Sequence, residues 1–326
     1  LAAGKSKRFG KKFLKQFYKY KNKEIIDHSV EKSLKSKLFK KIIIVSNNAR
    51  YLKKKKYSSI KTICVGNIYL GGTGKTSLSL KVNEILKSKV KSCFIKKYYP
   101  NQIDEQKILA NHGKLFKSKY RSSSIEQAID EKFELAIFDD GLQDPSIKYD
   151  YRIVCFNIDN WIGNNFTIPS GPLRESIKNL KKYKNVFLNG NNENIDNIIK
   201  FIHNLDSNIN IYQGEYVPLN INEFDKSEKY LVFSGIGNHK TFISMLRKNN
   251  INIVKEIEFP DHYRYLQKEI DDIISMSEKL NCKVMTTEKD YMRLNNNDKI
   301  FYIKSELKIL NQETFINDIS KVYENN

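Results

Sequence analysis

The chain has 326 residues, of which 40% are hydrophobic and 29% are charged. It is therefore long enough for two folded domains and too apolar for a disordered chain. The formal net charge is +20, and residues 1–61 hold 20 of the 57 lysines and arginines but only three of the 37 acids. A basic segment thus precedes a nearly neutral body. Such a segment suits an anionic membrane face or nucleic acid, and a generally lysine-rich composition explains it equally well.

The cysteines and the apolar runs exclude further classes. Cys64, Cys93, Cys155 and Cys282 are scattered without metal-ligand spacing, so we expect buried thiols of a cytoplasmic protein and not a disulfide framework. No apolar run approaches the roughly 20 residues that span a bilayer, and no signal peptide is visible. Because the first residue is Leu1 and not Met, we expect a fragment or an imperfect gene model.

Residues 1–50 carry a pattern of their own. A basic loop with glycines at both ends (residues 4–10) precedes a helical pattern from residue 25 and a β-branched strand at 41–45. Backbone N–H groups and basic side chains in such a loop suit a triphosphate. The stretch resembles the start of the methylerythritol-phosphate cytidylyltransferases of isoprenoid synthesis, in which this loop and Lys15 hold CTP. The rest of that enzyme is missing, so we expect a partial nucleotidyltransferase-like α/β fragment without activity, followed by a basic linker to residue 56.

From residue 57 onward, strands alternate with helices, which indicates parallel α/β layers. A strand at 62–65 leads into a glycine-rich loop, and a helix with regularly spaced apolar residues follows. This context is typical of a phosphate-binding loop. Its candidate nucleotide-binding residues are Gly71, Gly72, Thr73, Gly74, Lys75 and Thr76. Lys75 would reach the β- and γ-phosphates of ATP, and Thr76 would ligate Mg²⁺. Tyr69 stands where the usual pattern has its first glycine, and the alternative is a glycine-rich turn without function.

A second nucleotide feature lies about 65 residues downstream. The apolar strand 135–138 ends in Asp139 and Asp140, followed by Gly141. Alone this is a turn signal. Carboxylates at the carboxyl end of a strand beside a phosphate loop hold Mg²⁺ in this fold class, so the pairing favours a metal site.

Six blocks in order resemble the tetraacyldisaccharide 4′-kinases of lipid A synthesis in Gram-negative bacteria. They cover nearly all of residues 61–294 and lie at residues 65–76, 139–143, 169–175, 233–238, 259–263 and 287–290. The phosphate loop of that family has the same non-glycine residue at the position of Tyr69. The resemblance implies transfer of the γ-phosphoryl group of ATP, with Mg²⁺, to the 4′-hydroxyl of tetraacyldisaccharide 1-phosphate.

The resemblance also implies roles for single residues. His262 would be the base that activates the sugar hydroxyl, and Asp104 would orient it. Imidazole suits this task because it titrates near neutral pH. Glu105 would join Asp139, Asp140 and Thr76 around Mg²⁺. Arg174 and Asn67 would contact the substrate, Arg174 as a phosphate clamp.

One segment departs from the family pattern. Lys96, Lys97, Tyr98 and Tyr99 stand where the family carries Arg-Gly-Tyr-Gly, although Lys96 or Lys97 keeps a positive charge there. The family also begins with a hydrophobic helix that docks at the inner membrane, and in this chain residues 1–50 take that place. We expect a peripheral, monomeric protein at the cytoplasmic face of the bacterial inner membrane, acting on a lipid and binding no nucleic acid.

The expected fold is α/β: a P-loop NTPase-type parallel sheet domain at 57–225 and a smaller α/β lobe at 226–326 that carries His262. The alternatives are a partitioning-type ATPase, a cytidylyltransferase and a basic nucleic-acid-binding protein. Leu70 stands where the partitioning ATPases have a signature lysine, and most of a cytidylyltransferase is missing. The near neutrality of the body argues against the nucleic-acid-binding protein.

Overall fold

The structure, a computed structural model, describes residues 59–99, 103–190, 194–261, 263–294, 297–310 and 312–324, together with Lys19, Tyr20, Lys23, Glu24, His28, Ser29, Lys32 and Tyr57. By its contacts the chain divides into two units, Leu1–Lys55 and Lys56–Asn326. In the first, β1 (Lys19–Tyr20) and β2 (Lys23–Glu24) pair antiparallel. The predicted CTP loop at residues 4–10, Lys15 and the predicted strand 41–45 lie outside the described residues.

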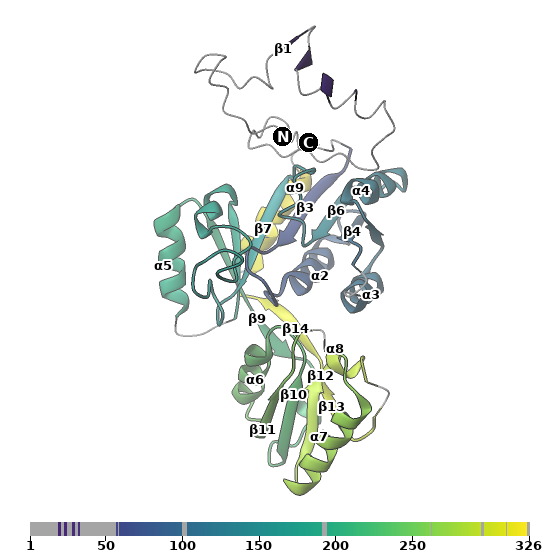
Figure 1. Cartoon of the computed structure of the whole chain (residues 1–326), viewed down its shortest axis with the longest axis vertical. Coiled ribbons are helices and arrows are strands. Elements are labelled where there is room, and N and C mark those ends of the chain that lie inside the picture. Colours follow the sequence, from purple (N-terminus) through teal and green to yellow (C-terminus); the bar gives the residue numbers. More distant parts are fainter. Residues whose placement is uncertain are drawn as a thin grey trace. The chain divides into compact units, whose positions relative to one another are not determined.

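The second unit is built on an eight-stranded sheet with the order β14-β9-β8-β7-β3-β6-β4-β5 (Figure 1). Every neighbouring pair in it is parallel except β14 with β9. The strands are β3 (Lys61–Gly66), β4 (Ser92–Lys97), β5 (Leu115–Ser118), β6 (Leu135–Asp139), β7 (Tyr151–Asn157), β8 (Asn185–Asn189), β9 (Asn210–Pro218) and β14 (Ser305–Ile309). The predicted strands at 62–65 and 135–138 are confirmed as β3 and β6.

Helices cover both faces of this sheet, as in doubly wound α/β folds. They are α2 (Lys75–Leu86), α3 (Ile103–His112), α4 (Arg121–Asp130), α5 (Ile195–Leu205) and α9 (Gln312–Glu324), with 3₁₀ turns at Ile177–Lys182 and Ile221–Glu223. Buried residues of α2 and α9 share one hydrophobic core, and buried residues of α4 and α5 share another. The central strands are buried on both faces, which explains why apolar residues follow one another without alternation at residues 63–65 of β3 and 135–138 of β6.

The strand order decides which motifs meet. β3 pairs with β6 on one side and β7 on the other, and Val65 lies opposite Asp139 in the register. On the far side of β6, Lys96 of β4 also lies opposite Asp139. Carboxyl ends of parallel strands share one edge of the sheet, so the glycine loop after β3 and the carboxylates after β6 come together there.

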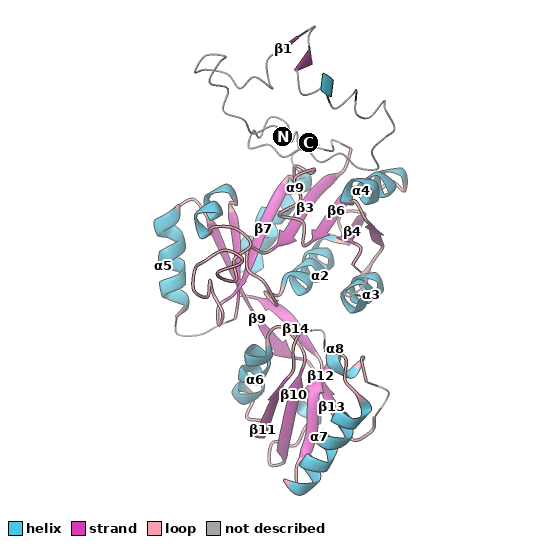
Figure 2. Ribbon diagram, viewed as in Figure 1, coloured by secondary structure: helices cyan, strands magenta, loops and turns pink. Residues whose placement is uncertain are grey.

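A second sheet of four parallel strands has the order β11-β10-β12-β13 (Figure 2). Its strands are β10 (Lys229–Ser234), β11 (Asn252–Glu258), β12 (Lys283–Thr287) and β13 (Ile300–Ile303). Helix α6 (His239–Lys248) packs on one face and α7 (Gln267–Lys279) on the other, and α8 (Glu288–Tyr291) follows β12. The predicted α/β character of this part is therefore confirmed.

The predicted boundary between 57–225 and 226–326 needs one correction. After β13 the chain returns to the first sheet, where β14 pairs antiparallel with β9 and covers its edge. Phe315 and Ile319 of α9 are buried in the core that α2 shares. Residues 305–324 thus belong with the larger sheet, because their apolar side chains complete its core.

The cysteines are free thiols, and Cys64, Cys93 and Cys155 are buried as predicted, whereas Cys282 is only half-buried. Burial raises the pKa of Cys64 to about 12 and that of Cys93 to about 12. Within the described part of the chain, no helix combines the length and the apolar composition that crossing a bilayer requires.

Candidate active site

The glycine loop runs from the end of β3 to the start of α2 at Lys75. Gly71 has φ 99° and Gly74 has φ 81°, conformations that glycine adopts without the penalty of a side chain. The first N–H groups of α2 have no partners within the helix and carry its positive dipole end. The loop therefore offers an anion site where the sequence predicts nucleotide phosphates.

Asn67 braces this loop from inside. Its Nδ2 donates to Thr73 Oγ1 at 3.0 Å and to the Gly71 carbonyl at 3.3 Å, and the residue is fully buried. Gln143 in turn donates to the Asn67 carbonyl at 2.9 Å. This placement gives Asn67 a role in shaping the loop, and its predicted contact with the substrate stays a prediction.

Thr76 and Asp139 meet at the start of α2. The Thr76 hydroxyl donates to Asp139 Oδ2 at 3.1 Å. Asp139 is fully buried at the end of β6, and its Oδ1 has no hydrogen-bond partner in the described structure. A hydroxyl and a buried carboxylate with an unsatisfied oxygen fit Mg²⁺, which binds proteins through a few oxygen ligands and takes the rest from phosphates and water. No cluster of three or more His, Cys, Asp or Glu side chains suited to a metal occurs among the described residues, and such a Mg²⁺ site does not need one.

Lys96 lies between two of the predicted metal ligands. Its Nζ is 2.6 Å from Glu105 Oε2 and 2.5 Å from Asp139 Oδ2. Burial alone would raise the pKa of Glu105, but the adjacent Lys96 ammonium, with Lys75 and Lys289 farther off, lowers it to about 2. The sequence analysis named Lys96 only as one of two lysines that keep a positive charge in the segment that departs from the family pattern. The signal that could have placed it is a lysine within the apolar strand 92–97 beside the carboxylate-bearing strand.

Asp140 and Arg174 form a second pair. Arg174 Nη1 donates to Asp140 Oδ1 at 2.7 Å and to Gln143 Oε1 at 3.3 Å. Burial would raise the pKa of Asp140, yet the Lys75 and Arg174 charges hold it below its usual range. Asp140 has φ 60°, a conformation uncommon for a side-chain-bearing residue and frequent at functional sites.

The second sheet approaches the glycine loop directly. A Cβ on Gly72 would lie 2.9 Å from Gly237 Cα, and a Cβ on Gly237 would lie 3.0 Å from Asp261 Oδ2. Asn157 Nδ2 donates to Asn238 Oδ1 at 2.8 Å and thereby joins β7 to the residue before α6. Gly237, Asn238 and Asp261 thus lie beside the phosphate loop.

The side chains of two predicted catalytic residues are not described by the structure. His262 lies outside the described residues, and for Asp104 only the backbone, in α3, is described. The predicted base and its orienting carboxylate therefore stay predictions.

A further block stabilises the second sheet. Asp290 Oδ2 accepts hydrogen bonds from the Gly235 N–H at 3.1 Å and from the Thr287 hydroxyl at 2.7 Å. The Tyr265 hydroxyl donates to Asp290 Oδ1 at 3.0 Å. This network joins the blocks at 233–238 and 287–290. The buried Asp290 carboxylate therefore fixes the position of the residues beside the glycine loop.

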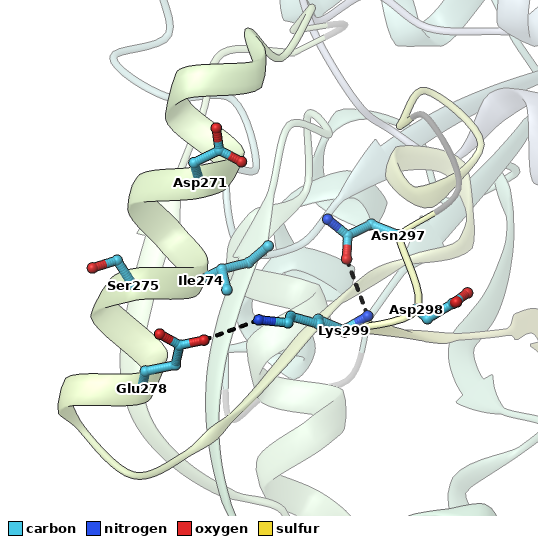
Figure 3. A pocket seen from close by; sticks show the side chains of 7 residues that line it. All are labelled: Asp271, Ile274, Ser275, Glu278, Asn297, Asp298 and Lys299. Carbon is cyan, nitrogen blue, oxygen red and sulfur yellow. Dashed lines mark hydrogen bonds and ion pairs between the residues drawn. The ribbon is translucent and has the colours of Figure 1, made fainter.

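A surface hollow lies beside α7 (Figure 3). It is lined by Asp271, Ile274, Ser275, Glu278, Asn297, Asp298 and Lys299. Lys299 Nζ pairs with Glu278 at 3.0 Å across it. None of the predicted site residues lines this hollow, which is open and charged.

The fold and the site together define a P-loop NTPase-type α/β protein, with a glycine loop and a facing carboxylate on the neighbouring strand. The sequence matches the model of the tetraacyldisaccharide-1-P 4′-kinase family at residues 34–115 and 99–324. The chain belongs to this family. The match begins inside the segment that we interpreted as cytidylyltransferase-like, and that resemblance of residues 1–50 stays a prediction.

Curated relatives and a solved structure agree with this assignment. A tetraacyldisaccharide 4′-kinase of Pelagibacter ubique (strain HTCC1062) is 58% identical over 272 residues, which cover 82% of this chain and 87% of the relative. One of Rickettsia typhi (strain ATCC VR-144 / Wilmington) is 34% identical over 281 residues, covering 80% and 85%. The crystal structure of the "apo" form of LpxK from Aquifex aeolicus in complex with ATP matches with a TM-score of 0.62 and 20% identity, covering 90% of this chain and 94% of the other. At that identity the likeness shows the fold.

Proposed function

We propose that this protein is an ATP-dependent kinase that transfers the γ-phosphoryl group to the 4′-hydroxyl of tetraacyldisaccharide 1-phosphate. The observation that carries the proposal is the contact between Thr76 and Asp139 at the foot of the glycine loop, in a chain that belongs to the family. Phosphoryl transfer needs positioning and electrostatic stabilisation more than covalent chemistry. The arrangement offers both on one edge of the sheet.

The chain's own groups would divide this work. The N–H groups of residues 71–76 and the Lys75 ammonium bind the phosphates of ATP and offset their charge. The Arg174 guanidinium has five N–H donors. Its Nη1 and Nη2 contact Asp140 and Gln143 through some of them, and the others remain for a phosphate oxygen. Asn67 holds the loop in shape.

Thr76 and Asp139 are the residues that would hold Mg²⁺, and Glu105 and Asp140 would orient it or its water. When bound, Mg²⁺ neutralises charge on the β- and γ-phosphates. Both Glu105 and Asp140 are ionised near neutral pH, because neighbouring cations lower their pKa values. Lys96 pairs with Glu105 and Arg174 pairs with Asp140. Lys96 also pairs with Asp139, but only Asp139 contacts the Thr76 hydroxyl as well, so we assign Glu105 and Asp140 an outer role.

His262 would remove the proton from the 4′-hydroxyl, and Asp104 would orient its imidazole. The support from the fold is indirect: the neighbouring Asp261 approaches Gly237, which packs against Gly72 of the glycine loop. This contact supports a base contributed by the second sheet.

We also propose peripheral, monomeric association with the cytoplasmic face of the inner membrane, because the substrate is an acylated lipid. In this proposal residues 61–218 with 305–324 bind the nucleotide, and residues 226–303 deliver the base. Residues 1–56 contribute neither CTP binding nor cytidylyl transfer.

The test is phosphate transfer from radiolabelled ATP to the detergent-dispersed disaccharide. Lys75→Ala should abolish transfer while the protein keeps its melting temperature, and Lys87→Ala, an exposed lysine just after the same helix, is the matched control. Full activity of the Lys75 variant would refute the proposed use of the loop.

The same assay tests the base. His262→Gln should lower kcat by about 10²–10⁴-fold, the usual worth of general base catalysis, and leave the affinity for Mg²⁺–ATP nearly unchanged. A His262→Gln enzyme with wild-type kcat would remove the base role and leave the kinase proposal standing.

A further inference from the structure

Lys96 combines deep burial with two close carboxylates. It is the fifth residue of β4, its side chain is only 2% exposed, and it lies in register with Asp139 on the adjacent strand. Its Nζ reaches Glu105 on α3 at 2.6 Å and Asp139 on β6 at 2.5 Å. One ammonium group therefore joins two carboxylates, Glu105 and Asp139, that lie 34 positions apart in the sequence.

Such a lysine is costly to bury and stays charged only when paired. Burial would lower the pKa of Lys96, but the Asp139 and Glu105 charges outweigh it and raise the pKa above its usual value. The converse also holds, because two buried carboxylates without a cation between them would repel each other. The three charges therefore depend on one another.

We propose that Lys96 is a positioning residue for phosphoryl transfer: its ammonium joins Glu105 and Asp139 and fixes both carboxylates before nucleotide and metal bind. The inference rests on the proposed placement of Thr76 and Asp139 at the metal. Asp139 Oδ2 accepts both from Lys96 and from the Thr76 hydroxyl, so movement of this carboxylate would displace the hydroxyl's partner.

The proposal has a consequence that needs no catalysis. In the wild-type protein the ammonium already compensates the charge of the two carboxylates. Binding of Mg²⁺ without nucleotide should therefore add little to the stability of the protein. Without the ammonium, the same carboxylates form an uncompensated pair that a divalent cation would neutralise. Removal of Lys96 should therefore make the stability of the nucleotide-free protein depend on Mg²⁺.

The test measures thermal unfolding of the full chain without nucleotide, in EDTA and in saturating MgCl₂. Lys96→Met keeps the length of the side chain and removes its charge. We expect its melting temperature in EDTA to fall by roughly 5–15 °C, as for loss of one partner of a buried ion pair. MgCl₂ should restore a large part of the lost melting temperature in this variant and should change the melting temperature of the wild-type protein little. Lys114→Met, which breaks the exposed pair with Glu131 at 2.9 Å, should match the wild type in both conditions.

Kinetics add a second readout. Mispositioned carboxylates should lower kcat by about 10²-fold and change KM for ATP less, because Lys75 and the loop N–H groups still bind the phosphates. Lys96→Arg should recover most of the rate, since a guanidinium also bridges two carboxylates. If Lys96→Met does not fold, Lys96→Met with Glu105→Gln removes one of the two charges and should regain stability in EDTA.

Three outcomes would overturn the proposal. One is a Lys96→Met protein with the wild-type melting temperature in EDTA, and another is a loss of stability that MgCl₂ does not reverse, as lost packing alone predicts. A wild-type kcat for Lys96→Met would do the same. The melting measurements use neither ATP nor lipid, so they can fail while the kinase proposal holds. The Lys75→Ala assay can likewise fail while the melting temperature of the Lys96→Met variant still depends on Mg²⁺.

Discussion

Gly74 and Gly71 make a matched pair for testing how the glycine loop holds phosphate. Both have positive φ, 81° and 99°, so an alanine at either position costs roughly 1–2 kcal/mol of backbone strain. Their surroundings differ. A Cβ on Gly71 meets nothing within 4 Å, whereas a Cβ on Gly74 would collide with the Asn189 amide, whose Cγ is 3.1 Å away, and would lie 3.3 Å from the Tyr216 hydroxyl.

The collision adds a second cost at Gly74. Asn189 is fully buried at the end of β8, so its amide cannot turn into solvent, and overpacking of this kind costs about 1–3 kcal/mol. We expect Gly74→Ala to lower the free energy of unfolding by about 2–5 kcal/mol in total and Gly71→Ala by about 1–2 kcal/mol. Because Gly74 precedes the first turn of α2, its displacement should also weaken ATP binding.

Urea unfolding measures the stability difference, and titration with a fluorescent ATP analogue measures the affinity. The expected order is wild type, Gly71→Ala, then Gly74→Ala in both assays. Equal losses for the two variants would show that backbone strain alone matters and that Asn189 yields without cost. A Gly74→Ala protein with wild-type affinity would contradict the proposed role of this loop in holding phosphate.

Two more predictions concern titration and thiol reactivity. Glu105 has a folded-state pKa of about 2, below its ordinary 4.5, so the stability that its ionised form contributes is present above pH 4.5 and is lost as the pH falls toward 2. In Glu105→Gln the midpoint of urea unfolding should depend less on pH in this window. A pH profile equal to that of the wild type would contradict the pairing with Lys96. Among the cysteines, Cys282 should react first with a thiol reagent in the native protein, because it is half-buried whereas Cys64 is fully buried with a pKa of about 12. Prompt native modification of Cys64, or equal rates for Cys282→Ser and wild type, would argue against this order.

Much of the nucleotide site could be predicted from local sequence. The strand Lys61–Gly66, the glycine loop and the helix from Lys75 follow one another directly, so their residue types specify them without reference to distant parts of the chain. The same holds for the strand Leu135–Asp139 with its terminal carboxylate. The order of six motif blocks gave the family, which the comparisons confirm.

Other features depended on long-range pairing, which residue patterns do not encode. Strand register placed Lys96 opposite Asp139, and a sequence alone does not say which strands are neighbours.

The sequence by itself determined the kind of chemistry and the local elements that carry it. Only the tertiary structure decided how the charges combine, with Lys96 between Glu105 and Asp139 and Arg174 on Asp140. It also decided that Ser305–Ile309 returns to the first sheet. The physical reason is that ion pairs, edge strands and core packing form between residues far apart in the chain, where burial and the exclusion of water fix partners that local propensity cannot specify.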